Sequence, residues 1–484
     1  MNHNKPYKII NGDSLQVLDT FNENSIDAII TDPPYELGFM GKKWDDTGIA
    51  YNVELWQKAL KVLKPGGYLL AFGGSRTFHR IACTIEDGGF EIRDTIMWLY
   101  GSGFPKSLNI GLAIDKKKGV ESIDTGIASP NARPNSTKEN TLYEGGTVGK
   151  EFNIKKATNE WDGWGTCLKP AFEPIIVARK PVEKSVADNV LKYGVGGINI
   201  DECRVPFEKT QNAATNPLYR KQGNYKLPEK GQKSNGAVNF SSSNNDVNEL
   251  GRFPSNIILT YDETDKDEVC GGMPDTKSTG GSGDASKTNT FANVRMGVNG
   301  TNTGAHLGGL GDEGSAARYF YCAKASKKDR DSGLILLEEK STGELQGGRK
   351  EGSAGSIMKN EDGTTRVNPY AGTGAPKKNI HPTVKPVELM QYLVRLVSPK
   401  GATILDIFNG SGSTGKAVAF ENRERNANYK YIGIELDGEY CKISESRIDY
   451  ALNKFKYDVF EEIEENEKKG QLSLFDFEES DGGE

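Results

Sequence analysis

Four residues near the N-terminus, Asp32-Pro33-Pro34-Tyr35, combine groups that could bind an amine carried on a planar ring. They follow an apolar stretch from Ile26 to Ile30, which predicts a buried strand. The two prolines prevent further strand pairing and stiffen the backbone, so a carboxylate, two carbonyls and an aromatic ring are held at the strand's carboxyl end. Open α/β sheets bind their ligands at this edge. Taken alone, the pattern is equally typical of a strand followed by a proline turn.

A second motif near the C-terminus is typical of a nucleotide-binding element. The residues 403–408 predict a strand, and Asn409-Gly410-Ser411-Gly412 predicts a tight turn before a helical pattern. Glu435 ends a further predicted strand, where a carboxylate can bind ribose hydroxyls. Its distance from Asp406 exceeds the usual spacing of about 20 residues, because a polar stretch at 421–430 lengthens the connection.

The order of these motifs resembles the permuted, beta-class family of amino-methylating DNA methyltransferases. In that family the catalytic motif comes first, the target-recognition region follows, and the S-adenosylmethionine motif comes last. Three further segments resemble family motifs. The residues 11–15 are similar to the N-terminal cofactor segment, 381–386 to the segment before the glycine turn, and 173–180 to the last core strand. The resemblance covers residues 1–182 and about 379–455.

The resemblance implies an α/β fold: a Rossmann-like class I methyltransferase sheet, circularly permuted, with a large inserted target-recognition region. Alternating helix and strand patterns between residues 55 and 100 independently indicate a parallel sheet. We expect the catalytic half of the core at 1–182, including a mobile excursion at about 120–165. The target-recognition region is expected at 183–378, the cofactor half at 379–457, and an acidic disordered tail at 458–484.

The resemblance also assigns the chemistry. The Asp32 carboxylate and the Pro33 carbonyl would accept both hydrogens of an exocyclic amine, which localises the lone pair on nitrogen for in-line attack on a methyl group. With Pro34 completing the corner, Tyr35 would stack on a base flipped out of the duplex. The expected S-adenosylmethionine contacts are Asp13, Thr383, Lys385, Asp406, Phe408, Gly410, Gly412 and Glu435.

Adenine is the favoured target base. The leading Asp32 is commoner in the adenine methylators of the family, whereas cytosine methylators usually carry Ser there, and N4-cytosine methylation is the alternative. RNA and protein amides are more distant alternatives, because protein-amide methylases usually have the glycine motif first. A DNA-binding interaction protein with a vestigial active site is a different class, against which intact Asp32, Tyr35, Asp406 and Glu435 argue.

The charge distribution is compatible with double-stranded DNA as the partner. The net charge is −6, but eleven acidic residues and only two lysines lie between Asp458 and Glu484, so the rest of the chain carries +3. A mildly basic body can contact phosphates. Basic residues between Arg204 and Arg330, including Arg252, are candidate DNA contacts.

The composition favours a cytoplasmic protein without a membrane segment or a metal, and the resemblance implies a restriction–modification type. No stretch approaches 18 uninterrupted apolar residues, and the N-terminus lacks a signal-peptide pattern. The six cysteines are scattered without a Cys-x-x-Cys pair, and the four histidines are dispersed, which argues against structural zinc.

The acidic tail contains one apolar cluster, Gln471-Leu472-Ser473-Leu474-Phe475. It resembles the motif with which bacterial proteins bind the sliding clamp, and short apolar motifs in charged tails order on binding a groove. The alternative is a C-terminal turn that folds back onto the body.

Overall fold

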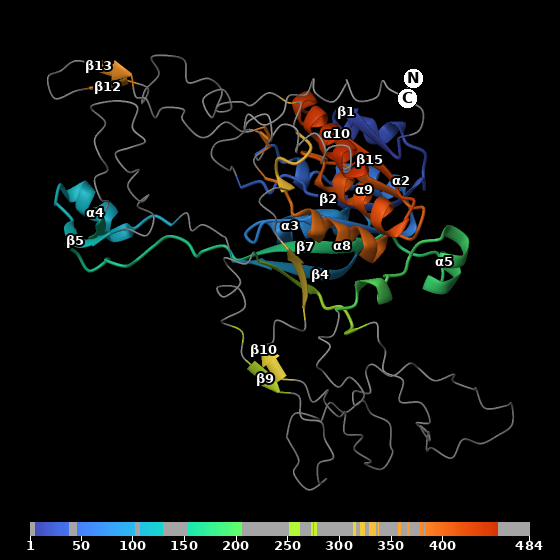
Figure 1. Ribbon diagram of the computed structural model, residues 1–484, viewed down its shortest axis with the longest axis horizontal. Coiled ribbons are helices and arrows are strands. Elements are labelled where there is room, and N and C mark those ends of the chain that lie inside the picture. The colour runs from blue at the N-terminus through green and yellow to red at the C-terminus, as the bar shows by residue number, and fades with distance from the viewer. Residues whose placement is uncertain are drawn as a thin grey trace, which may run out of the picture. The chain divides into compact units, whose positions relative to one another are not determined.

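The chain forms two compact units in the computed structural model (Figure 1). One unit is Ser102–Ala171, and the other contains the residues before and after it. The structure describes residues 5–37, 46–101, 107–128, 153–205, 251–261, 378–381 and 383–453. It also describes short pieces at 273, 275–277, 313–315, 320–324, 329–334, 337, 357–359 and 365–367.

A nine-stranded sheet forms the centre of the larger unit. Its strands, in spatial order, are β1 (Tyr7–Asn11), β15 (Lys430–Glu435), β14 (Thr403–Asp406), β2 (Ile26–Thr31), β3 (Leu63–Phe72), β7 (Phe172–Arg179), β4 (Glu91–Tyr100), β8 (Ile257–Tyr261) and β11 (Tyr321–Lys324). Neighbouring strands are parallel except at β7, which runs antiparallel to both β3 and β4. The predicted α/β fold is confirmed, and β14, from the far end of the sequence, pairs with β2.

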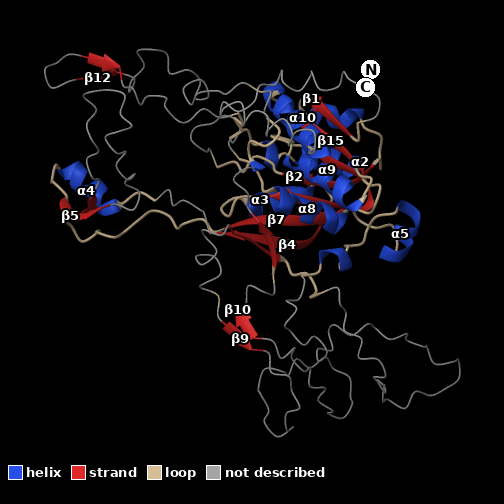
Figure 2. Cartoon of the chain, in the orientation of Figure 1, coloured by secondary structure: helices blue, strands red, loops and turns tan. Residues whose placement is uncertain are grey.

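Helices cover both faces of this sheet (Figure 2). The short α1 (Ser14–Val17), α2 (Val53–Val62) and α3 (Phe78–Asp87) lie on one face, and α8 (Val387–Val397), α9 (Ser413–Arg425) and α10 (Gly438–Leu452) lie on the other. Strand alternation explains the two cores, since Ala28 and Ile30 of β2 pack in one cluster and Ile29 packs in the other. The central strands are therefore apolar on both faces.

Part of the range 183–378 belongs to the central sheet. The core strand predicted at 173–180 is present as β7, and strands β8 and β11 extend the sheet beyond β4. Both strands are short and widely separated in the chain, so the sequence pattern did not predict that they pair. Helix α5 (Val186–Tyr193) and the 3₁₀ turn Asp201–Cys203 also pack on the core, where Cys203 is buried. The short hairpins are β9 (Asp275–Lys277) with β10 (Glu313–Ser315) and β12 (Ile357–Lys359) with β13 (Thr365–Val367).

Two arginines proposed from sequence as DNA contacts have contacts within the fold. Arg252 is only 3% exposed. Arg330 donates from Nη2 to the carbonyls of Asn379 and His381, at 3.2 and 3.0 Å. The sequence shows only that these residues are charged, which does not distinguish arginines that stabilise the fold from arginines on the surface.

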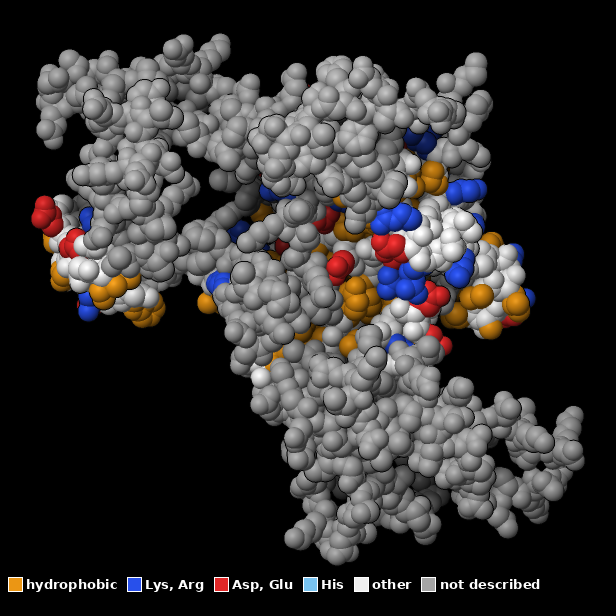
Figure 3. Space-filling view, viewed as in Figure 1, with side chains coloured by type: hydrophobic (Ala, Val, Ile, Leu, Met, Phe, Trp, Pro, Cys, Tyr) orange, Lys and Arg blue, Asp and Glu red, His pale blue; other side chains and the backbone are white. Residues whose placement is uncertain are grey.

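The smaller unit has secondary structure where the composition predicted a mobile excursion. It contains helix α4 (Ile110–Lys118) and an antiparallel pair, β5 (Ile123–Ala128) with β6 (Asn153–Lys156). Asp115 of α4 accepts hydrogen bonds from the Thr158 amide and the Asn159 side chain, at 2.8 and 2.7 Å, which ties the helix to the segment after β6. The described part of the range 120–165 therefore contains a strand pair, and its mobility stays a prediction. Apolar side chains lie on its surface, among them Leu168, which is 91% exposed (Figure 3).

Within the described ranges, no helix is both long and apolar enough to cross a membrane.

Candidate active site

The Asp-Pro-Pro-Tyr corner lies at the carboxyl edge of the sheet, directly after β2 and between β14 and β3. The Asp32 Oδ2 atom accepts a hydrogen bond from Lys385 Nζ at 2.6 Å. The other oxygen, Oδ1, is buried and has no hydrogen-bond donor among the described residues. A buried acceptor without a partner is costly, and an amine donor from a substrate would satisfy it.

Lys385 is the cation of this corner. Its side chain is 8% exposed, and its ammonium also lies 3.5 Å from Oε2 of Glu173. The ammonium is 5.3 Å from the ring centroid of Tyr35 and 5.0 Å from that of Phe72. Burial opposes the charged form, but the Asp32 and Glu173 carboxylates outweigh it and raise the pKa of Lys385. The lysine is therefore charged at neutral pH.

Tyr35 is fixed by its hydroxyl, which donates to Glu173 Oε2 at 2.8 Å. Burial, followed by the negative charges of Asp32 and Glu173, raises the pKa of Tyr35 well above its ordinary value, so the hydroxyl remains a donor. The Tyr100 hydroxyl donates to the second oxygen of Glu173, at 3.3 Å. Glu173 and Tyr100, which the sequence did not single out, therefore belong to the corner.

Asp406 connects the Asp-Pro-Pro-Tyr corner to the glycine turn. Its Oδ1 accepts from the Thr31 hydroxyl and its Oδ2 from the Thr414 hydroxyl, both at 2.7 Å. The Phe408 amide donates to the same Oδ1 at 3.1 Å. Burial raises the pKa of Asp406 to about 6 against the opposing effect of these donors. Because Thr31 directly precedes Asp32, the carboxylate fixes the turn relative to the corner.

The turn itself needs its glycines for backbone conformation and for packing. Gly410 and Gly412 have φ angles of 51° and 74°, a region that favours glycine. A Cβ at Gly410 would lie 2.8 Å from Nε2 of His381, and one at Gly412 would lie 2.3 Å from Oγ of Ser444. The glycines thus allow neighbouring side chains of the protein to approach the turn.

Glu435 lies beside the turn at the end of β15. Its Oε2 accepts from the Gly410 amide at 2.7 Å, and its Oε1 accepts from the Asp437 amide at 2.9 Å. Burial raises the pKa of Glu435, although these amides favour the charged form. The carboxylate is thereby oriented at the strand end.

The other predicted cofactor residues border the same edge. Asp13 caps α1 by accepting from the Leu15 amide at 2.9 Å, next to the end of β15. His381 contacts the carbonyl of Thr383 through Nδ1 at 2.5 Å, and its ring lies 4.7 Å from that of Tyr440. Burial lowers the pKa of His381 to about 4, so the imidazole is neutral at pH 7. The Thr383 side chain is exposed.

Buried charged side chains stabilise the glycine turn and the segments packed against it. Arg447 is fully buried and donates to the carbonyl of Ser411 at 2.7 Å. Lys416 donates to Asp329 Oδ1 at 2.6 Å, and Asp329 Oδ2 accepts from the Val387 amide at 2.9 Å. Asp329 lies inside the range expected for target recognition, so only the folded structure reveals its role.

Asn409 also stabilises the turn through its side chain, a role that the motif did not predict. Its Oδ1 accepts from the hydroxyls of Tyr431 and Ser444, at 2.8 and 3.2 Å.

The structure brings the predicted residues together along one sheet edge. Lys385 contacts Asp32, whereas the resemblance implied a cofactor carboxylate as its partner.

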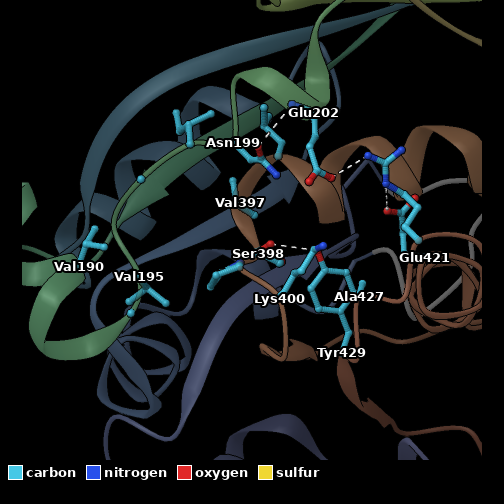
Figure 4. A pocket seen from close by; sticks show the side chains of 16 residues that line it. Val190, Val195, Asn199, Glu202, Val397, Ser398, Lys400, Glu421, Ala427 and Tyr429 are labelled. Carbon is cyan, nitrogen blue, oxygen red and sulfur yellow. Dashed lines mark hydrogen bonds and ion pairs between the residues drawn. The ribbon is translucent and has the colours of Figure 1, made fainter. Parts of the chain in front are cut away.

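A cavity of about 250 Å³ lies away from this edge (Figure 4). Its lining includes Ser398, Lys400, Ala427 and Tyr429, which precede β14 and β15, and therefore lies at the amino ends of these strands. Glu202 and Arg425 form a 2.7 Å ion pair in its wall. None of the predicted site residues lines it, so we do not assign it to the reaction.

Comparison with known families identifies the family of the chain. A family model described as DNA methylase, of the N6/N4 methyltransferase type, matches residues 26–446. The chain belongs to this family. Family members are S-adenosylmethionine-dependent DNA methyltransferases with a Rossmann-like α/β fold, as the resemblance implied.

Individual relatives match shorter parts of the chain. The type II methyltransferase M.HindIII of Haemophilus influenzae is 23% identical over 235 residues, covering 40% of this chain and 64% of the relative. The DNA adenine methyltransferase YhdJ of Escherichia coli is 38% identical over 71 residues, covering 15% of this chain and 22% of the relative. The matches thus span less than two thirds of either relative. Among solved structures, the cytosine-N4-specific PvuII DNA methyltransferase is 13% identical, with a TM-score of 0.36 and coverage of 92% and 93%.

Proposed function

We propose that this protein transfers a methyl group from S-adenosylmethionine to the N6 amine of adenine in double-stranded DNA. The observation that carries the proposal is the buried Oδ1 of Asp32, which has no hydrogen-bond donor within the described part of the chain. This acceptor lies at the sheet edge that also carries the glycine turn, and the Thr31–Asp406 hydrogen bond of 2.7 Å connects the two.

The residues at the edge fit the cofactor. Backbone of the turn from Phe408 to Gly412 can approach a ligand, while Glu435 presents an oriented carboxylate suited to ribose hydroxyls. We propose Asp13 and Thr383 as further contacts. When bound, S-adenosylmethionine supplies an electrophilic methyl group.

The chain's own groups prepare the amine. Asp32 Oδ1 and the Pro33 carbonyl accept its two hydrogens, which localises the nitrogen lone pair and orients it. Pro34 keeps this corner rigid, and the Tyr35 ring stacks on the extruded base. A carboxylate next to the nitrogen stabilises the positive charge that develops there and can accept the released proton.

Adenine is supported by the leading Asp32 and by the match to YhdJ, whose name specifies adenine. The alternative is N4-cytosine methylation, because both amines offer the same two hydrogens to the same acceptors.

Tritiated methyl transfer to plasmid DNA from a methylation-deficient host tests the proposal. The wild type should label DNA, and Asp32→Ala should not. Asp19→Ala, at an exposed carboxylate paired with Lys58, is the matched control and should retain activity. Chromatography of the digested nucleosides then separates N6-methyladenine from N4-methylcytosine. Label in the Asp32→Ala reaction would refute the catalytic assignment.

We further propose that residues of the range 183–378 outside the central sheet contact the recognition sequence. Most of them lie outside the described residues. Replacing only residues 206–250 and 278–312, which leaves β8, β11 and Asp329 in place, should change the methylated sequence without changing the chemistry of the product. Sequencing of the modified DNA would detect the change.

The tail motif Gln471–Phe475 also lies outside the described residues. We propose that it binds the bacterial sliding clamp. Deletion of residues 468–484 should abolish capture by immobilised clamp without changing methyl transfer to short DNA. Undiminished capture would exclude the tail as the attachment.

A further inference from the structure

We propose that Glu173 is a positioning residue for methyl transfer, which shares Lys385 with Asp32 and thereby keeps one Asp32 oxygen free for the target amine. The inference rests on the proposed function and deepens it, because it explains how the acceptor of the amine is prepared.

Glu173 connects three side chains of the corner. Its Oε2 accepts from the Tyr35 hydroxyl at 2.8 Å and lies 3.5 Å from Lys385 Nζ. Its Oε1 accepts from the Tyr100 hydroxyl at 3.3 Å. Glu173 itself lies on β7, in the interior of the sheet between β3 and β4. A carboxylate on a central strand is held more rigidly than one on a loop.

The charges at the corner are unequal. One ammonium, Lys385, faces two carboxylates, at 2.6 Å from Asp32 Oδ2 and at 3.5 Å from Glu173 Oε2. In a poorly solvated site each of these attractions is stronger than in water. Glu173 therefore draws part of the lysine's interaction away from Asp32, and the corner keeps a net negative charge that favours the positive charge developing on the amine.

The same arrangement leaves the two Asp32 oxygens in different environments. Lys385 occupies Oδ2, while Oδ1 is buried without a partner among the described residues. Without the Glu173 charge, the ammonium would interact with Asp32 alone. It would then move toward both oxygens and compete with the amine for Oδ1.

Glu173 also orients the stacking ring. The Tyr35 hydroxyl bond to Oε2 fixes the ring beside the acceptor, and a Cβ at Gly74 would lie only 3.2 Å from that ring. The Glu173 carboxylate therefore positions two groups at once: the Asp32 oxygen that accepts from the amine and the Tyr35 ring that stacks on the base.

The test compares Glu173→Gln with a matched control on the neighbouring strand. Glu91 of β4 pairs with Arg179 of β7 at 2.7 Å, at the opposite end of the same strand pair, so Glu91→Gln removes a similar charge away from the corner. The measurements are initial tritium transfer to plasmid DNA at saturating S-adenosylmethionine, cofactor binding by equilibrium dialysis, and the melting temperature. We expect Glu173→Gln to slow transfer about 10- to 100-fold, with cofactor affinity within about twofold of the wild type. Glu91→Gln should transfer at nearly the wild-type rate.

A double-mutant cycle with Lys385→Met tests the route of the effect. If Glu173 acts through Lys385, Glu173→Gln should cost little additional rate in the Lys385→Met background. Full additivity of the two substitutions would overturn the proposal, as would a Glu173→Gln rate within twofold of the wild type. Parallel loss of melting temperature and cofactor affinity would also overturn it, in favour of a general structural role. A wild type that transfers no methyl group would refute the proposed function instead, which separates the two failures.

Discussion

The ammonium of Lys385 lies 2.6 Å from Oδ2 of Asp32, which joins the segment before α8 to the strand end that carries the acceptor. This ion pair supports the proposal that Lys385 acts on the substrate side of the site.

Replacing Lys385 should therefore affect the rate more than cofactor binding. Lys385→Met removes the cation that the half-buried carboxylates of Asp32 and Glu173 share. We expect transfer to fall by about 100-fold or more, with a smaller change in the dissociation constant of S-adenosylmethionine. Lys58→Met, at a half-buried lysine that pairs with the exposed Asp19, is the control. A large loss of cofactor affinity without a change in maximal rate would support the role implied by the resemblance.

Glu435→Gln should weaken cofactor binding. A glutamine can accept from only one of the two amides that the carboxylate now binds, those of Gly410 and Asp437. We expect the dissociation constant of S-adenosylmethionine to rise about tenfold, which corresponds to about 1.4 kcal/mol. Equilibrium dialysis measures the change, and the exposed Glu445→Gln on α10 should bind like the wild type.

Asp329→Asn should destabilise the fold. The substitution removes the negative charge that Lys416 and Arg447 face, and both of these cations are almost fully buried. Breaking such a buried pair costs about 3 kcal/mol. Urea unfolding measures this cost, whereas Asp19→Asn at a surface pair should change the free energy of unfolding by less than about 1 kcal/mol. Equal effects of the two substitutions would contradict the bracing role.

His381 should make the fold sensitive to mild acid. Its pKa is lowered from 6.5 to about 4 in the folded protein, so between these values the unfolded chain binds a proton that the folded chain does not. The contribution of the neutral ring is present above pH 6.5 and is lost as the pH falls toward 4. We expect a loss of about 2 kcal/mol, because the partly accessible ring retains some solvation. The free energy of unfolding of His381→Gln should lack this part of the pH dependence, and His79→Gln should follow the wild type.

The sequence predicted those parts of the site that depend on local pattern. The corner at Asp32, the turn at Gly410 and the carboxylate at Glu435 each follow an apolar strand, so position in the chain sufficed to place them at one sheet edge. The sequence did not predict Glu173 as a site residue because it lies within a strand pattern. A polar residue there is expected as part of the alternation of polar and apolar residues.

The remaining elements depend on contacts between distant segments. Asp329 lies in a polar stretch without periodicity, and its burial follows from Lys416 and Arg447, which belong to two other helices. Strand β11 pairs with β8, and its own sequence pattern is too short to predict a strand of the central sheet without that partner. Local composition contains no information about such pairings.

The Thr31–Asp406 hydrogen bond joins residues 375 positions apart, and β14 fills the place between β2 and β15. During synthesis at about 5–20 residues per second, β2 must wait roughly 20–75 s for this neighbour to be made. Until then its apolar edge is open to pairing with other chains, a hazard of sheets dominated by distant contacts. We therefore expect that the N-terminal half expressed without residues 379–457 aggregates, and that co-expression of the two halves restores soluble protein.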